Sequence, residues 1–335
     1  MLPISHTSRI AVTSCSPNQL STKPDLSDSA SFINQISEIK NTPTSPQNTK
    51  SEMPISGSLM QRRQRAGGLK LNLLSTPKVV TDQVSSDFEK LKVNLENNYT
   101  RVDSSRYPEV TNANKTQVSF TDENTKETVG LAANYLQIAG KNIAIRTQSQ
   151  YPKDATSAIE QHLKMLMEEK PSVLVVIASQ NDIDGANLQS NPEKRLPLYF
   201  NHDASYGSID VKSESGDTLK YADQVNADSY QLTLIKANQT LTLPVIHITN
   251  WNDRTTISAE ALRTLAIKIN SKGEMPVIHC LSGSGRTGAI AAAMQLTQPD
   301  NQYSAYQVVE SLRNTGTPHM VQTEEQYRTL TELEG

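Results

Sequence analysis

The residues with the clearest chemical potential lie in the segment HCLSGSGRTG, residues 279–288, where five small or apolar residues separate a cysteine from an arginine. Two glycines alternating with two serines allow successive backbone N–H groups to turn inward around one anion, and the start of a following helix strengthens this attraction. Arg286 adds a planar fork of donors that fits two phosphate oxygens at once. This segment predicts a cradle for a dianionic tetrahedral group. The cradle residues are Leu281, Ser282, Gly283, Ser284, Gly285 and Arg286.

Cys280 opens this loop, and the same N–H groups and arginine favour its ionised form. Helix N-termini and nearby cations lower the pKa of protein thiols from about 8.5 to roughly 3.5–7.5. A thiolate beside a bound phosphoryl group can attack the phosphorus and form a covalent cysteinyl-phosphate. The alternative is that Cys280 is a buried apolar residue in an ordinary turn. The arginine, the glycines, the preceding apolar strand and the following helix together favour the nucleophile.

HCLSGSGRTG resembles the HCxxGxGRT/S signature of the cysteine-dependent protein-tyrosine phosphatases. The bare spacing of cysteine and arginine is shared with other phosphatases and with arsenate reductases, whereas the histidine before the cysteine and the GRTG after it narrow the class. The resemblance implies that Thr287 stabilises the departing Cys280 thiolate. It also implies that His279 hydrogen-bonds within the core and tunes the loop. A side chain at that strand end points away from Cys280, which argues against His279 as a base or metal ligand.

The segment NWND, residues 250–253, resembles the mobile loop that presents an aspartate in this family. The resemblance implies that Asp253 protonates the leaving tyrosine oxygen and later activates water. Trp251 would anchor the loop. The usual proline is replaced by Asn252, and losing the fixed φ of proline predicts a freer loop.

Two glutamines in MVQTEEQ, Gln322 and Gln326, match the family loop that positions the hydrolytic water. Their spacing of four residues predicts that both lie on one face of a helix. In isolation, either glutamine would be read as a solvated helix position.

Substrate selection requires a deep slot with an aromatic wall. SSRYPEV, residues 104–110, resembles the phosphotyrosine-recognition loop of the family. The resemblance implies that Tyr107 stacks on the substrate ring, with Val110 beneath it and Glu109 holding a backbone N–H of the substrate. Arg106 is expected to be structural. The alternative is a surface Tyr-Pro turn.

A closer resemblance, over residues 104–333, is to the phosphatase effectors that bacteria inject through type III secretion systems. It is carried by ANYLQI, by YPKDATSAIEQHLKMLMEEKPSVLVVIAS, by YGSIDVKS and by VIHITNWND. In that comparison Asp182 stands where a glutamate supports the phosphate-loop arginine. Because the aspartate is one methylene shorter, the comparison leaves open whether it reaches Arg286.

Hydrophobic periodicity predicts an α/β or α+β fold with helices on a mixed sheet, and the resemblance implies the protein-tyrosine phosphatase fold, a mixed twisted sheet flanked by helices. We assign residues 82–335 to this catalytic domain. Its first helix is expected to carry Phe88, Leu91 and Leu95 on one face, with Ser85 or Ser86 as N-cap. Strands are predicted at 131–138, 141–148, 172–179, 206–213, 229–237, 240–248 and 275–280, and helices at 85–99, 154–170, 257–270, 286–296, 303–314 and 323–333.

Residues 1–80 are dominated by Ser, Thr, Asn, Gln and Pro, and such a composition predicts a largely disordered segment. Local exceptions are a possible short helix at 32–39 and a possible strand at 69–74, which suits addition to the sheet edge of a secretion chaperone. The basic cluster at 61–65 is best explained as a solvated charge run.

Composition excludes several classes of protein. Two cysteines among 335 residues are too few for a disulfide framework, no CxxC or CxxH spacing suggests zinc, and a reducing compartment is expected. No metal or cofactor is expected. The net charge of −3 gives no basic footprint for nucleic acid. The longest apolar run, residues 172–178, is far below the ~18–20 residues of a membrane span, and the first residues lack a secretory signal pattern.

The resemblance to the effector phosphatases implies a secreted bacterial effector, a protein-tyrosine phosphatase delivered by type III secretion into the host cytoplasm, where it dephosphorylates host phosphotyrosine proteins. One alternative is a phosphotyrosine-binding module or impaired phosphatase that traps substrates without turnover; Asn252 and Asp182 favour it. Another is a dual-specificity enzyme with a shallower pocket, which a deep slot walled by Tyr107 would exclude.

Overall fold

A computed structural model describes residues 82–92, 98–121, 126–150, 155–184, 196–222 and 224–334. The expectations for residues 1–80, including those for 32–39, 61–65 and 69–74, lie outside these described residues.

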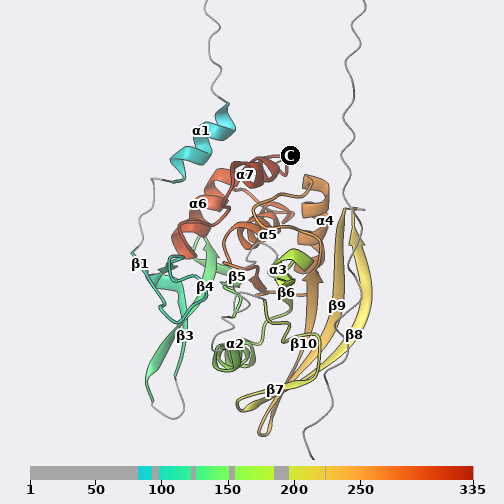
Figure 1. The fold of residues 1–335 in the computed structure, drawn as a ribbon. Coiled ribbons are helices and arrows are strands. Elements are labelled where there is room, and N and C mark those ends of the chain that lie inside the picture. The colour runs from blue at the N-terminus through green and yellow to red at the C-terminus, as the bar shows by residue number, and fades with distance from the viewer. Residues whose placement is uncertain are drawn as a thin grey trace, which may run out of the picture. The chain divides into compact units, whose positions relative to one another are not determined.

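Along the chain, runs of strands are separated by helices and three helices follow the last strand, as in an α+β fold with a mixed sheet (Figure 1). The helices are α1 (Gln83–Lys90), η1 (Asn114–Thr116), α2 (Ala155–Glu169), α3 (Gln180–Asp184), α4 (Ala259–Asn270), α5 (Gly285–Leu296), α6 (Ala305–Thr315) and α7 (Glu324–Thr331). The strands are β1 (Tyr99–Thr100), β2 (Asn112–Ala113), β3 (Gln117–Thr121), β4 (Thr128–Ile138), β5 (Lys141–Thr147), β6 (Leu174–Ile177), β7 (Ala204–Tyr206), β8 (Ile209–Tyr221), β9 (Val225–Lys236), β10 (Gln239–Ile248) and β11 (Val277–His279). Every helix and strand predicted between residues 82 and 333 overlaps one of these elements.

The nine-stranded sheet has the order β3-β4-β5-β11-β6-β10-β9-β8-β7. The four central strands β5, β11, β6 and β10 are parallel, and the strands on either side of them pair antiparallel. The predicted mixed sheet is therefore confirmed. Because the carboxyl ends of parallel strands share one edge of the sheet, β11 delivers the cysteine loop to the edge where such folds bind their ligands.

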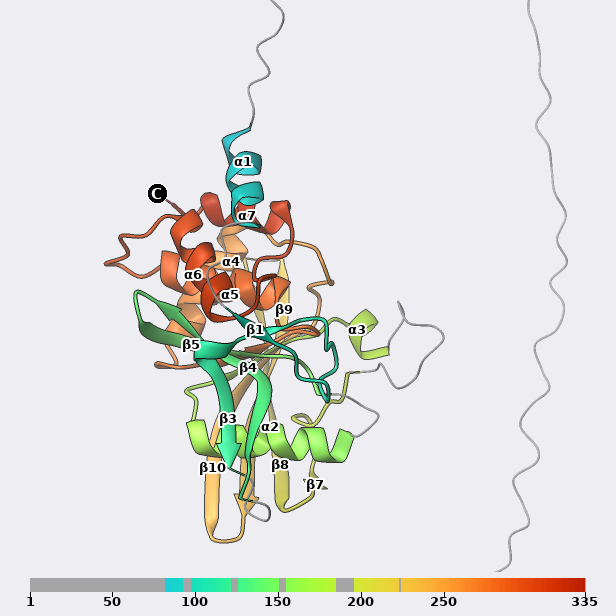
Figure 2. The ribbon, with the colours of Figure 1, turned by 90° about the vertical axis from the view of Figure 1, so that its left-hand side faces the viewer.

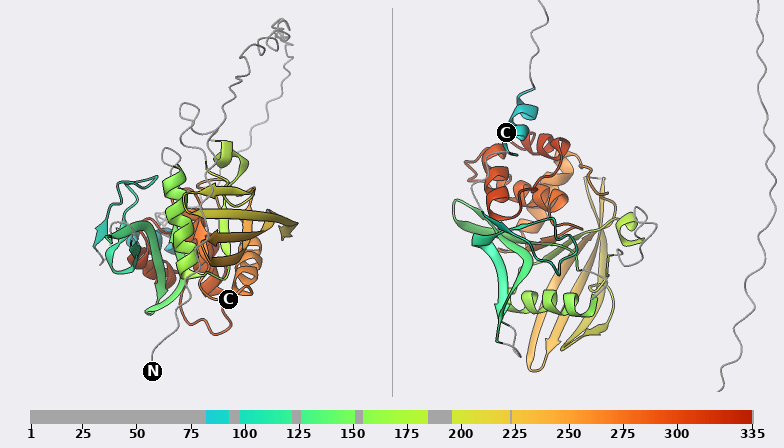
Figure 3. Two further views of the ribbon diagram at one scale, coloured as in Figure 1. Left: turned by 90° about the horizontal axis from the view of Figure 1, so that it is seen from below. Right: turned by 60° about the vertical axis from the view of Figure 1, so that its left-hand side comes forward.

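The two faces of the sheet bury separate apolar clusters, which is why β6 is apolar at every position. On one face, Leu174 and Val176 pack with residues of α2 such as Leu163. On the other face, Val175 and Ile177 belong to the cluster that includes α4 to α7. The view from below in Figure 3 shows α2 crossing the centre of the sheet.

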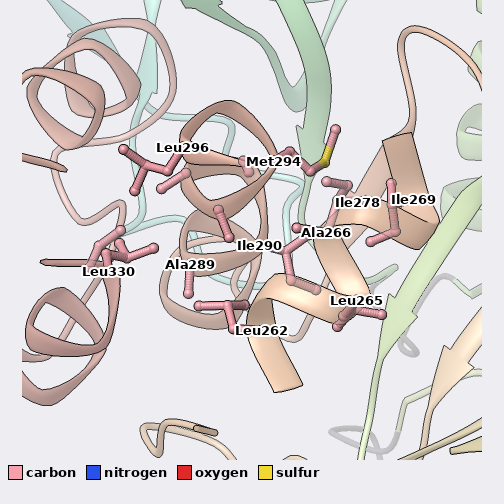
Figure 4. Close-up of a cluster of buried hydrophobic side chains, with 14 of the residues drawn as sticks. Leu262, Leu265, Ala266, Ile269, Ile278, Ala289, Ile290, Met294, Leu296 and Leu330 are labelled. Carbon is pink, nitrogen blue, oxygen red and sulfur yellow. The ribbon is translucent and has the colours of Figure 1, made fainter. Parts of the chain in front are cut away.

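Helix α5, which begins in the cysteine loop, is buried on all sides: every residue except Gln295 is buried. Its Gly and Ala residues allow α4, α6, α7 and β11 to pack closely around it, and Figure 4 shows Ile290 and Ala289 among Leu262, Ile278 and Leu330. A helix that is apolar all round is stable only inside a core. This packing fixes the position of its first turn, where Arg286 lies.

The first helix differs from its prediction. Helix α1 begins at Gln83, with Asp82 rather than Ser85 or Ser86 as the N-cap, because the Asp82 side chain accepts from the Val84 N–H. The rings of Phe88 and Tyr327 pack against each other with their centroids 5.8 Å apart. Helix α1 therefore lies beside α7 (Figure 2).

Candidate active site

The cysteine loop is fixed by the end of β5. Cys280 directly follows β11 and is only 1% exposed. The Leu281 carbonyl accepts hydrogen bonds from both the backbone N–H and the hydroxyl of Ser149, at 2.9 and 3.2 Å. Gly283 has φ +67°, and a Cβ there would lie 2.2 Å from the carbonyl oxygen of Thr147. Only glycine combines that conformation with that close approach.

The start of α5 leaves backbone donors for an anion. Ser284 is the N-cap of this helix, yet it makes no side-chain capping hydrogen bond. The first N–H groups of a helix have no acceptor within the helix, and they carry its positive dipole end. The loop and the first turn of α5 therefore have the electrostatic character predicted for the cradle.

Arg286 is buried and held from three sides. Its Nη1 donates to Asp182 Oδ2 at 2.6 Å and to the Trp251 carbonyl at 2.8 Å, and its Nη2 donates to Asp253 Oδ1 at 3.1 Å. The shorter aspartate at position 182 therefore does reach the arginine. Among the described residues, the Nε of Arg286 has no partner.

The charges around Arg286 stabilise its guanidinium. Burial alone would lower its pKa, but Cys280, Asp182 and Asp253 hold that pKa above the ordinary value. Asp182 is itself fixed, because its Oδ2 also accepts from the N–H and the hydroxyl of Ser179. The arginine therefore stays charged and oriented.

Hydrogen bonds close the loop that carries Asp253. Trp251 is buried and donates from Nε1 to the Thr255 carbonyl at 3.0 Å. The Asn252 carbonyl accepts from the Thr255 hydroxyl at 2.8 Å, and the Asn252 side chain accepts from Asn181 at 3.4 Å. Residue 252 is therefore held by hydrogen bonds at its carbonyl and its side chain, where the family has a proline ring. The Asp253 side chain is 37% exposed.

A cleft of about 250 Å³ opens above the cysteine loop. It is lined by Tyr107, Glu109, Val110, Asp253, Arg254, Leu281, Ser282, Ser284, His319 and Gln322. The structure thus brings together residues that are more than 200 positions apart in sequence, as the resemblance implied for the recognition segment, the acid loop and the cysteine loop.

The recognition turn is held in place by a residue that the sequence analysis missed. Gln148, at the end of β5, accepts from the Tyr107 N–H at 2.8 Å and donates to the Tyr107 and Val110 carbonyls at 3.1 and 3.3 Å. Its position beside the end of β11 was a usable signal, because neighbouring parallel strands end at one edge. Arg106 donates to the Gln150 carbonyl at 3.0 Å, in keeping with its expected structural role.

Two other residues of the cleft were not predicted. Arg254 has φ +58° and is exposed directly after Asp253, and His319 lies in the segment before α7. No spacing in the sequence singles out His319. Arg254 could have been found as the neighbour of the proposed acid.

The two glutamines occupy different environments, which corrects the prediction that both lie on one helical face. Gln322 precedes α7 and lines the cleft. Gln326 is fully buried, and its amide oxygen accepts from the N–H groups of Gln322 and Thr323 while its amide nitrogen donates to the Thr255 carbonyl. Gln326 therefore joins α7 to the loop that carries Asp253, whereas Gln322 faces the cleft.

The residues flanking the cysteine and arginine are both fully buried. His279 Nδ1 lies 3.2 Å from the carbonyl oxygen of Cys280, so the histidine hydrogen-bonds to the loop as expected. The Thr287 hydroxyl has no hydrogen-bond partner among the described residues.

Within the described ranges, no group of three or more His, Cys, Asp or Glu side chains is arranged to hold a metal ion. No helix in this part of the chain combines the length and apolarity needed to cross a membrane.

Comparison with known proteins identifies the family and the fold of the chain. The family model described as protein-tyrosine phosphatase matches residues 101–333. Tyrosine-protein phosphatase YopH of Yersinia pseudotuberculosis is 37% identical over 135 residues, which are 40% of this chain and 26% of that protein. The secreted effector protein SptP of Salmonella paratyphi A is 29% identical over 139 residues, 42% of this chain and 22% of that protein. The matches thus span about a quarter of the length of these relatives.

Solved structures show the same fold. The catalytic domain of human protein tyrosine phosphatase non-receptor type 18 superimposes with a TM-score of 0.59 at 17% sequence identity, covering 75% of this chain and 94% of that domain. A second structure, whose title concerns the recognition of distinct HER2 tyrosine phosphorylation sites by the same phosphatase, gives a TM-score of 0.58 at 18% identity. It covers 75% of this chain and 93% of that one. The fold prediction is confirmed.

Proposed function

Because the chain belongs to the protein-tyrosine phosphatase family, we propose that it hydrolyses phosphotyrosine in proteins through a cysteinyl-phosphate intermediate. The observation that carries this proposal is the orientation of the Arg286 guanidinium. Its Nη1 donates to both Asp182 and the Trp251 carbonyl. The Nε and Nη2 atoms form the edge of the fork that a phosphoryl group would bind in bidentate fashion. No cofactor or metal enters this mechanism.

In the first step the Cys280 thiolate attacks phosphorus, the S–P bond forms and the bond from phosphorus to the tyrosyl oxygen breaks. The electron pair on the leaving oxygen takes a proton from Asp253, and tyrosine departs. Asp253 now accepts from Nη2 of Arg286 at 3.1 Å. A bound phosphoryl group competes for the same Nη2, so we infer that substrate releases the Asp253 carboxyl toward the leaving group.

In the second step Asp253 takes a proton from water, the water oxygen attacks phosphorus and the S–P bond breaks. Phosphate leaves, the thiolate is restored and Asp253 is again protonated. Gln322 lines the cleft and would orient the water. Thr287 has a buried hydroxyl available to donate to the departing thiolate.

Selectivity for phosphotyrosine would come from the wall of the cleft. Tyr107 is part-buried, and burial raises the pKa of its phenol. Gln148 holds the Tyr107 backbone at both its N–H and its carbonyl, so the ring is presented from a fixed turn. An aromatic substrate ring can stack on Tyr107, with Val110 beneath and Glu109 at the rim. Phosphoserine has no ring and is too short to place its phosphate in such a slot.

The direct test is phosphate release by the wild-type chain from one peptide prepared in a phosphotyrosine and a phosphoserine form. We expect turnover of the phosphotyrosine form only. Equal turnover of both forms would point to the dual-specificity alternative. Binding of the phosphotyrosine peptide without any phosphate release would identify a substrate-trapping module and refute the proposed function.

We further propose that the protein is a secreted bacterial effector that passes through a type III secretion system and acts on host phosphotyrosine proteins in the host cytoplasm. In this proposal residues 1–80 form a largely disordered segment for secretion and chaperone binding, and 82–335 form the catalytic domain. Support comes from the similarity of the catalytic region to YopH and to the secreted effector SptP, and from the polar composition of residues 1–80.

A fusion of residues 1–80 to a reporter enzyme tests the secretion proposal. The reporter is expected inside host cells when the bacterium has a working type III system, and only in the bacterium when that system is deleted. A fusion that lacks residues 1–80 is the control. Delivery that does not depend on the secretion system would contradict the proposal.

A further inference from the structure

A buried chain of hydrogen bonds leads from the cysteine loop to helix α2. His279 Nδ1 lies 3.2 Å from the Cys280 carbonyl oxygen, and its Nε2 lies 3.1 Å from the Tyr199 hydroxyl. The same hydroxyl lies 2.8 Å from Nε2 of His162, on α2. His162 is 5% exposed, and Tyr199 and His279 are fully buried. The mechanism described above makes no use of His162.

The chemistry of these groups sets the direction of the chain. A carbonyl oxygen only accepts, so Nδ1 of His279 must carry the proton that it shares with Cys280. In a neutral imidazole the other nitrogen is then an acceptor, so Tyr199 donates to Nε2 of His279. The Tyr199 oxygen is left to accept, and Nε2–H of His162 is the donor.

We propose that His162 is a positioning residue for Cys280, which acts through Tyr199 and His279. Its Nε2–H occupies the Tyr199 oxygen and leaves the hydroxyl hydrogen directed at His279. That donation fixes the His279 tautomer whose Nδ1–H binds the Cys280 carbonyl. The inference deepens the proposed function and depends on it.

The reverse direction would displace the loop. If Tyr199 donated to His162, then Nε2–H of His279 would donate to Tyr199, and the Nδ1 lone pair would face the Cys280 carbonyl at 3.2 Å. Two acceptors in contact in a buried site repel each other and leave both unsatisfied. The Cys280 peptide would have to move, and the sulfur would move with it.

The surroundings keep both histidines neutral, as the chain requires. Burial lowers the pKa of His279 to about 4, and the charges of His247 and Arg106 lower it further, against the hydrogen bond to Cys280. Burial and the neighbouring His279 also lower the pKa of His162 well below its usual value. Protonation would turn Nε2 of His279 from an acceptor into a donor, and with His162 also donating, the Tyr199 hydroxyl hydrogen would have no acceptor in the chain. The donor on His162 therefore opposes protonation of His279.

Substitution of His162 by Phe removes the donor and keeps a planar ring in the core. We expect kcat for the phosphotyrosine peptide to fall by roughly 2- to 10-fold, the worth of one neutral hydrogen bond, with KM unchanged because His162 does not touch substrate. Nitrogen NMR of His279 should show a higher pKa, since the Tyr199 hydroxyl is then no longer held toward His279 and can turn to accept from the imidazolium. His162→Gln, whose amide can donate in the same direction, should lie closer to wild type.

A double-mutant cycle with Tyr199→Phe separates positioning from packing. If His162 acts through Tyr199, His162→Phe should cause no further loss in the Tyr199→Phe background. Met165→Leu, at a buried neighbour of His162 on α2 that makes no polar contact, controls for repacking of the helix and should match wild type. Additive losses, an unchanged His279 spectrum in His162→Phe, or equal effects of Phe and Gln would overturn the inference. The NMR measurement of His279 tests the hydrogen bonds among His162, Tyr199 and His279 even if the wild type hydrolyses no phosphopeptide.

Discussion

The Cys280→Ser variant is expected to lose turnover of a phosphotyrosine peptide by roughly 10⁴- to 10⁶-fold, the range seen when a hydrolase loses its nucleophile. A serine hydroxyl is a much weaker nucleophile toward phosphorus than a cysteine sulfur. The side chain is 1% exposed and changes by a single atom, so packing should be preserved. Initial rates with both proteins at equal concentration measure the effect.

Binding distinguishes loss of chemistry from loss of the site. Arg286 and the start of α5 do not depend on the sulfur, so Cys280→Ser should still bind the phosphotyrosine peptide in a calorimetric titration. Its thermal unfolding should match wild type. Residual turnover above about 1% of wild type would mean that the covalent route is not the main one.

The Asp253→Asn variant is expected to reduce kcat by roughly 10²- to 10⁴-fold, which is the usual contribution of a general acid. The amide keeps the size of the side chain but cannot donate a proton to the leaving tyrosine oxygen. The loss should be smaller for an aryl phosphate with an acidic phenol, because such a leaving group needs less protonation.

A second aspartate, outside the cleft, controls for the loss of one negative charge in Asp253→Asn. Asp228, on β9, accepts from the Thr218 hydroxyl on β8 at 2.9 Å in an exposed hydrogen bond, and Asp228→Asn should retain wild-type kcat for every leaving group. An Asp253→Asn variant that lost activity equally for all leaving groups would show that Asp253 holds Arg286 rather than supplying the proton.

The elements that carry the site were predictable because their sequence patterns are local. The apolar run in β6 predicts a buried strand, and the glycines and serines around Cys280 predict a turn into a helix. The fold followed from these patterns and from the family signature together. The strands β1, β2 and β3 and the short helices η1 and α3 were missed, because each has five residues or fewer and so short a segment cannot establish a period.

Side-chain contacts between distant segments could not be predicted. Spacing in the chain does not reveal that the Asp182 carboxylate reaches the Arg286 guanidinium. Nor does it reveal that the Gln326 amide hydrogen-bonds to backbone groups. The position of Gln148 beside β11 could be read from the sequence, but its hydrogen bonds to the Tyr107 turn, and that of His162 to Tyr199, arise from tertiary packing. These contacts depend on tertiary distances, whereas local patterns report only on secondary structure and burial.

The most direct test of the covalent mechanism is rapid-quench mass spectrometry of the chain during turnover of a phosphotyrosine peptide. Gln322→Ala is used beside wild type to slow the water attack and accumulate the intermediate. The mechanism predicts one phosphoryl group on the peptide fragment that contains Cys280, formed as fast as tyrosine is released and absent from Cys280→Ser. Continued turnover with no phosphoryl group on Cys280 at any time would contradict it.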